Sequence, residues 1–244
     1  MDHDCFPAHI RDLSRAAQRS GSPRFTAFLT PGEITLSRQE QQKGITQTFW
    51  GGWEDAERQM LCLHPDDYSV APDAFPFSCV KLTYRRQDTI THRDLLGSVL
   101  GLGLKRELIG DLLITEGTAY LFVCKAAVPV VCDQLVRVGR IGVSTEISAF
   151  DGAYTRAFEE ISGTVASVRL DAVVRLATNL SRERAASLIL AQAVMKNGLP
   201  VLSASAPVNE GDILSIRGSG KFRLKSVSGP TKKGRLHLIL EKYC

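Results

Sequence analysis

Residues 167–222 read SVRLDAVVRLATNLSRERAASLILAQAVMKNGLPVLSASAPVNEGDILSIRGSGKF, and this segment carries the clearest structural signals in the chain. Apolar residues recur at i, i+3, i+4 and i+7 from Leu170 to Ala177, which predicts an amphipathic helix. Ser181 suits a helix N-cap because its hydroxyl oxygen can accept a backbone N–H bond. The apolar spacing resumes from Ala185 to Ile189, so we predict two short helices here.

The first turn of the second predicted helix is unusually basic. Arg182 and Arg184 flank Glu183, the only acidic residue there. The helix macrodipole disfavours cations at this end. A phosphate partner would resolve the conflict, because free N–H groups, the dipole and two guanidinium groups would then converge on one anion.

A small sheet is predicted to follow the helices. Asn197-Gly198 between two apolar runs is a strong hairpin signal, since both turn positions need positive φ. A turn ending at Asp212 leads into a strand at Ile213–Ile216, and a basic run, Arg217–Phe222, follows. Basic residues at both helix starts and on the turns would then form one continuous positive face.

These features together resemble the S4 RNA-binding domain. That family combines an Arg-Leu-Asp helix start, a Ser-Arg second helix start, an Asn-Gly hairpin and a Gly-Asp turn before a basic strand. The corresponding segments in this sequence are Arg169–Asp171, Ser181–Ala185, Val194–Gly198 and Gly211–Leu214. The match covers roughly 55 residues, and four motifs in register are specific.

The resemblance implies RNA contact by five residues, and the predicted positive face adds four more. The resemblance implies Arg169, Ser181, Arg182, Lys196 and Arg217; the additions are Arg184, Asn197, Lys221 and Arg223. Asp171 is expected to be structural and to hold the end of the first helix. Lys232 and Lys233, in a basic loop, are secondary candidates.

Composition and charge agree with a polyanion-binding protein. The 244 residues are 44% hydrophobic and 23% charged, which is ordinary for a globular protein. From residue 161 onward there are 13 Lys and Arg against 5 Asp and Glu, a net charge of +8, whereas the whole chain carries +4. We expect no membrane span or signal peptide. The six cysteines form no C-x-x-C pair, which favours reduced thiols in a cytoplasmic protein.

The first 75 residues indicate a small α/β domain. We predict a helix over Ile10–Arg19 and another beginning after Thr30, with Pro31 at its first position. A strand is expected at Thr48–Trp50. Trp53–Met60 is helical in character, and residues 63–76 are interpreted as a linker or surface loop.

Residues 76–150 follow the pattern βαββαβ, which is typical of ferredoxin-like and RRM domains. Thr91 suits the N-cap of the first helix, a second helix is predicted over Lys125–Val138, and the last strand over Ile141–Ile147. The RRM signature is absent. Tyr120 and Phe122 could stack on bases, but an ordinary half-buried sheet is the preferred interpretation. Residues 158–167 are interpreted as a connection, and residues 223–240 as a hairpin.

Several segments resemble the YlmH family of bacterial RNA-binding proteins, with matches along nearly the whole chain. They are Phe28–Pro31, Gly51–Arg58, His92–Gly97, Leu100–Glu107 and Ile109–Asp111. The resemblance implies an α+β protein with three domains: a small N-terminal α/β domain (1–75), an RRM-like middle domain (76–150) and an S4-type RNA-binding domain (160–244). Gly32 departs from the more charged helix start expected in that family.

The family resemblance also implies a function. We expect a non-catalytic factor that binds ribosomal RNA, and tRNA, on the large subunit and acts in rescue of stalled peptidyl-tRNA complexes. We expect no catalysis and no cofactor, because no nucleophile–base pair, Walker A motif or dinucleotide fingerprint is present. We also expect no metal, and a monomer. Two alternatives remain: an RNA-modifying enzyme with its site in the N-terminal domains, and an adaptor that contacts cell-division proteins.

Overall fold

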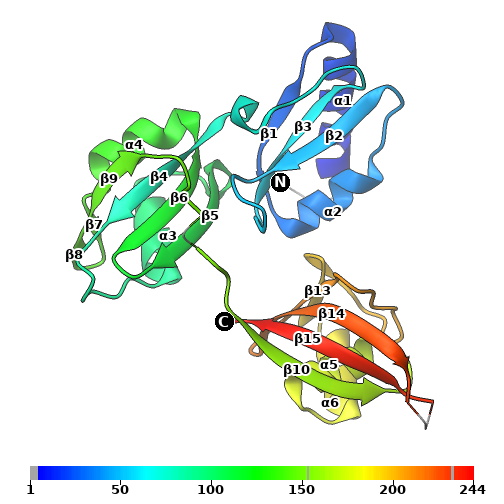
Figure 1. Ribbon diagram of the computed structural model, residues 1–244. Coiled ribbons are helices and arrows are strands. Elements are labelled where there is room, and N and C mark those ends of the chain that lie inside the picture. The colour runs from blue at the N-terminus through cyan, green and yellow to red at the C-terminus, as the bar shows by residue number, and fades with distance from the viewer. Residues whose placement is uncertain (1–4, 153, 232–233) are drawn as a thin grey trace. The chain divides into compact units, whose positions relative to one another are not determined.

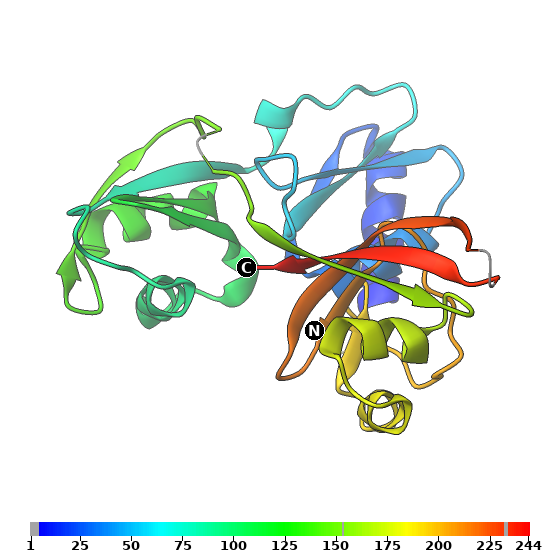
Figure 2. The same cartoon turned by 60° about the horizontal axis from the view of Figure 1, so that its bottom comes forward.

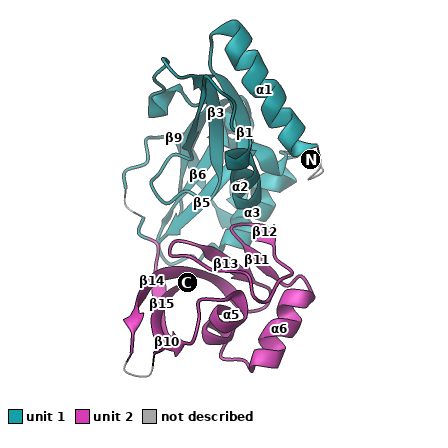
Figure 3. Ribbon diagram, turned by 90° about the vertical axis from the view of Figure 1, so that its right-hand side faces the viewer, with its two compact units in different colours: residues 1–155 teal, residues 156–244 magenta. Residues whose placement is uncertain are grey.

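The computed structural model describes residues 5–152, 154–231 and 234–244, and it divides into two compact units, 1–155 and 156–244 (Figure 3). Both units mix helices with antiparallel sheets. No helix in the described ranges is long and apolar enough to cross a membrane. The predicted contacts Lys232 and Lys233 lie outside the described residues. The division of the first unit near residue 75 stays a prediction.

A three-stranded sheet with two helices forms the first part of unit 1 (Figure 1). The strand order is β1-β3-β2, and both pairings are antiparallel. The elements are α1 (Phe6–Ser20), β1 (Arg24–Leu29), α2 (Pro31–Gln39), β2 (Ile45–Trp50) and β3 (Gln59–Pro65). Thr30 caps α2 and shares a capping box with Glu33, so the predicted helix start is confirmed.

The helix predicted over Trp53–Met60 is wrong, and the loop predicted over residues 63–76 begins only at residue 66. Residues 51–58 form turns, and β3 continues to Pro65 as the central strand, with Leu61 and Leu63 fully buried. The cause is distant in sequence. The buried carboxylate of Asp111 accepts hydrogen bonds from Trp53 Nε1 at 3.0 Å and from the backbone N–H groups of Glu57 and Arg58 at 2.8 and 3.0 Å.

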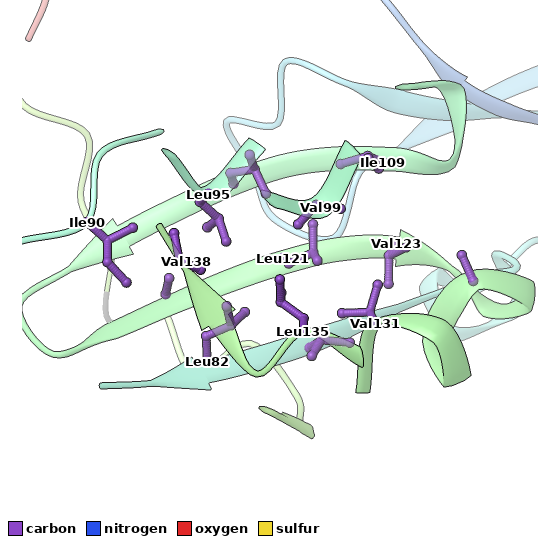
Figure 4. Packing of buried hydrophobic residues seen from close by; sticks show 14 of the residues in the cluster. Leu82, Ile90, Leu95, Val99, Ile109, Leu121, Val123, Val131, Leu135 and Val138 are labelled. Carbon is purple, nitrogen blue, oxygen red and sulfur yellow. The ribbon is translucent and has the colours of Figure 1, made fainter. Parts of the chain in front are cut away.

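A four-stranded antiparallel sheet with order β5-β6-β4-β9 forms the second part of unit 1. Its elements are β4 (Phe77–Thr83), α3 (His92–Gly101), β5 (Ile109–Thr115), β6 (Thr118–Cys124), α4 (Val128–Gln134) and β9 (Ser144–Ile147). Short 3-10 turns lie at Pro72–Ala74, Arg106–Leu108 and Lys125–Ala127. Residues from β4, β5, β6, α3 and α4 pack into one hydrophobic core, part of which Figure 4 shows.

The second helix of this part is shorter than predicted. α4 ends at Gln134, and Arg137–Val138 forms a strand, β7, that pairs with β8 (Ile141–Gly142). Val138 is 1% exposed, so it closes one end of the core instead of continuing a helix. The turn between β7 and β8 contains Gly139 at φ 58°, a conformation that interrupts a right-handed helix.

The face of this sheet opposite α3 and α4 is also buried. Tyr120 and Phe122 on this face are 2% and 1% exposed. Both faces of the sheet are therefore covered, whereas we expected a half-buried sheet. The ring of Phe150 lies 5.2 Å from that of Tyr120 and 5.9 Å from that of Phe122. Gly52 lies so close to Phe122 that a Cβ at this position would overlap the ring. These two aromatic residues are therefore core residues.

Unit 2 packs two helices on a six-stranded antiparallel sheet of order β10-β15-β14-β13-β11-β12 (Figures 1 and 2). The helices are α5 (Leu170–Thr178) and α6 (Arg182–Leu190). The strands are β10 (Phe158–Val165), β11 (Val194–Lys196), β12 (Leu199–Pro200), β13 (Ile213–Ile216), β14 (Gly220–Pro230) and β15 (Leu236–Tyr243). Both predicted helices, the Asn197-Gly198 turn and the C-terminal hairpin are confirmed.

The connection predicted at residues 158–167 is wrong. This segment forms β10, an edge strand that pairs with β15 along eight residues, from Phe158 opposite Tyr243 to Val165 opposite Leu236. Its alternation is obscured because Ser162 and Gly163 stand where β-branched or aromatic residues are typical of a strand. The segment has a weak intrinsic preference for strand structure, and its pairing with the long strand β15 holds it in the sheet.

Candidate RNA-binding surface

One buried carboxylate joins the starts of the two helices in unit 2. The Asp171 side chain is 5% exposed and lies in the first turn of α5. Its Oδ1 accepts from Arg169 Nε at 3.2 Å, and its Oδ2 accepts from Arg182 Nε at 3.2 Å. Arg169 and Arg182 remain 40% and 72% exposed. Asp171 therefore fixes two arginines from different helices without removing them from solvent.

A chain of contacts continues from Arg169 to the β11–β12 hairpin. Arg169 makes a backbone bridge with Pro207, and the carbonyl of Pro207 accepts a hydrogen bond from Lys196 Nζ at 3.0 Å. Lys196 also lies 3.5 Å from Asp212 Oδ2. Arg169, Arg182 and Lys196 are therefore brought together, as the sequence predicted for one surface.

Asn197 has a structural role in the hairpin. Its backbone has φ 51°, and its Oδ1 accepts from the backbone N–H of Ile213 at 2.8 Å. Its Nδ2 donates to Asp212 Oδ1 at 2.7 Å. The side chain thus connects the turn to the start of β13. Asn197 lies beside Lys196 on this surface, but these side-chain bonds already engage its amide.

The start of α6 presents one capping hydroxyl and one exposed arginine. Ser181 Oγ accepts from the backbone N–H of Arg184 at 3.3 Å, so the predicted N-cap is confirmed. Arg184 is exposed, as is Arg217 in the turn after β13. Neither arginine forms an ion pair within the part of the chain that the structure describes.

Lys221 and Arg223 lie on the opposite face of the sheet from the helices. Side chains alternate along a strand, and their neighbours Phe222 and Leu224 point into the core beneath α5 and α6. The guanidinium of Arg223 donates to Glu241 Oε2 at 2.8 and 2.6 Å and lies 4.9 Å from the Phe158 ring centroid. The single continuous face predicted from the sequence is therefore divided between two faces.

Glu241 is the electrostatic centre of that second face. Burial raises its pKa, but hydrogen bonds from Arg223 and Lys225 outweigh this effect and hold the pKa below the ordinary value of 4.5. Lys221 Nζ lies 5.4 Å from the ring centroid of Tyr243. These basic residues are thus paired within the sheet, in contrast to the exposed arginines near the helix starts.

Sequence reasoning missed the residues that hold the helix-side surface in shape. Asp212 contacts both Lys196 and Asn197, and residues 204–207 lie along the start of α5 through backbone bonds to Leu170 and Asp171. The Gly-Asp turn was visible in the sequence as a motif. Nothing in the sequence placed its carboxylate against a lysine that is 16 residues earlier in the chain.

Unit 1 contains a cleft of about 360 Å³ lined in part by Arg58, Arg106 and Glu33. Arg58 Nε donates to the carbonyl of Ile109 at 2.9 Å, and its Nη2 donates to that of Phe28 at 2.9 Å. Burial lowers the pKa of Arg58 and lowers that of Arg106 to about 10. The Arg58 bonds fasten backbone segments together. Among the described residues, no group of three or more His, Cys, Asp or Glu could hold a metal ion.

Comparisons with known proteins show which family the chain belongs to. Residues 71–151 match the family model described as “Putative RNA-binding domain in YlmH”. The “Ribosome-associated protein quality control protein P2” of Bacillus subtilis (strain 168) is 33% identical over 247 residues, which cover 99% of this chain and 95% of that protein. The chain belongs to the YlmH family. The membership expected from the sequence is therefore confirmed.

A solved structure shows the same fold within the family. The “Cell division protein ylmH” from Streptococcus pneumoniae matches with a TM-score of 0.55 and 22% identity, and the match covers 64% of this chain and 97% of that chain. This likeness concerns the fold alone. The mixed α/β architecture of this YlmH family member is thus shared with a solved relative.

Proposed function

We propose that this YlmH family member is a non-catalytic RNA-binding protein whose unit 2 binds structured ribosomal RNA, and tRNA, on the large subunit during ribosome-associated quality control. The relative from Bacillus subtilis carries that process in its name. We also propose that the middle segment is an RRM-like domain and that unit 2 is an S4-type RNA-binding domain. It also includes a monomeric state and a cytoplasmic location.

The observation that supports the proposal most strongly is the Asp171 cluster. Arg169 and Arg182 are oriented by one carboxylate, and both guanidinium groups remain accessible to solvent. Arg184 is exposed at the start of α6, where the helix dipole also favours an anion. Oriented cations and a helix N-terminus suit a phosphate ester, because contacts to phosphates position a protein on RNA without reading bases.

The proposal predicts that Arg182→Ala weakens binding to refolded large-subunit ribosomal RNA. The loss should be about 1–3 kcal/mol, since one charge-assisted contact disappears. The log–log dependence of the binding constant on salt should become shallower by about 1, because one fewer counterion is released. Filter binding across a series of salt concentrations measures both quantities.

Arg19→Ala is a suitable control, because Arg19 is exposed at the end of α1 in unit 1. The control removes the same charge outside the proposed surface and should leave affinity close to that of the unaltered protein. Equal affinities for the Arg182 variant, the control and the unaltered protein would remove Arg182 from the site.

The two alternative functions stay predictions. An RNA-modifying enzyme would need a reactive group in unit 1, and two buried charged residues there, Asp111 and Arg58, hold backbone segments in place. An adaptor for cell-division proteins would need a protein-binding surface, and the basic cluster in unit 2 favours a polyanion instead.

A further inference from the structure

Residues 71–151, which match the RNA-binding family model, form a sheet that is covered on both faces. In RRM domains, aromatic side chains on the open sheet face stack on bases. Here Tyr120 and Phe122 are buried, and the hydroxyl of Tyr120 donates to Asp151 Oδ2 at 2.7 Å. Any RNA contact by residues 71–151 must therefore use another surface.

Four exposed arginines lie on the two loops at one end of this segment. We call this group the arginine tip: Arg85, Arg86, Arg137 and Arg140. The first two follow β4, and the other two belong to the β7–β8 hairpin. Both loops lie at the same end of the four-stranded sheet in Figures 1 and 2.

Core packing holds the two loops side by side. Ile90, which ends the first loop, and Val138, which lies within the hairpin, are 4% and 1% exposed in the same hydrophobic cluster. Figure 4 shows both side chains at one end of that cluster. The hairpin leads into β9, and Ser144 at the start of β9 pairs with Thr83 at the end of β4.

The arginine tip is positively charged. Within the described ranges, none of its four arginines forms an ion pair, and Asp88 and Glu116 are the acidic residues on the adjacent turns. The Cγ atom of Arg86 lies so close to Gly117 that a Cβ at residue 117 would crowd it, and Arg86 is exposed. Because core residues anchor both loops, binding has to order only the arginine side chains and not the loop backbones.

We propose that the arginine tip is a second RNA-binding site, which contacts the phosphate backbone of folded RNA without reading its bases. This inference rests on the proposed function and adds a footprint in unit 1 to the one in unit 2. Phosphates suit the tip because guanidinium groups bind them with paired N–H donors. Base stacking on the sheet does not contribute, because Tyr120 and Phe122 are buried.

The test replaces all four tip arginines by glutamine in the full-length protein. The probe is refolded large-subunit ribosomal RNA, measured by filter binding across a series of salt concentrations. The salt slope should become shallower by about 3, and affinity near 0.1 M salt should fall by about tenfold or more, as four phosphate contacts are lost. Circular dichroism and thermal unfolding should match the unaltered protein, since all four side chains are exposed.

A matched control removes four other exposed basic residues of unit 1. The substituted residues are Arg15, Arg19, Arg24 and Lys43. If the tip variant and this control bind RNA equally, the tip proposal is wrong, and Arg182→Ala then decides separately whether unit 2 binds RNA. Loss of binding to intact large subunits with unchanged RNA affinity would assign the tip to a ribosomal protein and overturn the proposal.

Discussion

Asp171 illustrates how one residue can support binding while carrying the wrong charge for it. Its carboxylate offsets part of the positive potential at the helix starts, which weakens attraction of RNA at long range. It also fixes the long side chains of Arg169 and Arg182, whose free rotamers would otherwise cost about 2 kcal/mol each to order. Because charges are screened beyond about 8 Å at physiological salt, the local effect should dominate there.

We therefore predict that Asp171→Asn weakens RNA binding although it makes the protein more positive. The amide still offers an oxygen to the backbone N–H of Ala172, so α5 keeps its first turn. Its NH₂ group cannot accept from Arg182, and the arginine loses its orientation. The expected loss is about 1 kcal/mol at 0.15 M salt, measured by filter binding alongside thermal unfolding.

Glu160→Gln is the charge-matched control for this prediction. Glu160 pairs with Lys225 on the sheet face away from the helices, so its loss changes the net charge by the same amount without touching Arg169 or Arg182. Equal or tighter binding by the Asp171 variant, relative to this control, would show that charge outweighs orientation.

At the scale of the elements, Glu241 ties three strands of the unit 2 sheet together. It lies on β15, accepts from Arg223 on β14, and contacts Lys225, which also pairs with Glu160 on β10. We predict that Glu241→Gln lowers the free energy of unfolding at pH 7 by about 2 kcal/mol, because it leaves Arg223 without its carboxylate. Urea denaturation followed by circular dichroism measures the loss.

This loss should disappear in acid. The folded state holds the pKa of Glu241 below its ordinary value, so the unfolded chain takes up the proton first as the pH falls. The stabilisation is complete above about pH 5 and is lost as the pH falls from 4.5 through the lowered pKa. The difference between the variant and the unaltered protein should therefore narrow between pH 5 and pH 3. A constant difference would show that Glu241 acts by packing alone.

Elements with local signals were predictable from the sequence, and elements fixed by distant partners were not. Capping residues such as Thr30, Thr91 and Ser181 placed helix starts correctly, because an N-cap acts within three residues. The turns over residues 53–58 were mistaken for a helix, because Asp111, more than 50 residues away, takes their N–H groups. Residues 158–167 were mistaken for a connection, because their strand depends on pairing with β15.

The candidate site was predictable in composition but not in arrangement. The motifs named Arg169, Arg182 and Lys196, and the structure brings these together. Periodicity could not place Lys221 and Arg223 on the far face, because that depends on which alternate residues of β14 meet the helices. The role of Asp171 was likewise foreseen only as support for α5, since its bond to Arg182 crosses between helices.

At the scale of the whole molecule, the two proposed RNA-binding sites lie in different compact units. Unit 2 has its own hydrophobic core, which includes residues from both helices and five of its strands. The arginine tip belongs to unit 1 and is absent from residues 156–244. A deletion therefore tests which part of the binding energy each unit supplies.

We predict that residues 156–244 produced alone unfold cooperatively and still bind refolded large-subunit ribosomal RNA. Their core does not draw on unit 1, so thermal unfolding should show one transition. The salt slope should be shallower than that of the full chain by about 3, because the four contacts of the tip are missing. A fragment with the same slope as the full chain would place every phosphate contact in unit 2. A folded fragment without RNA affinity would instead place the main contact in unit 1.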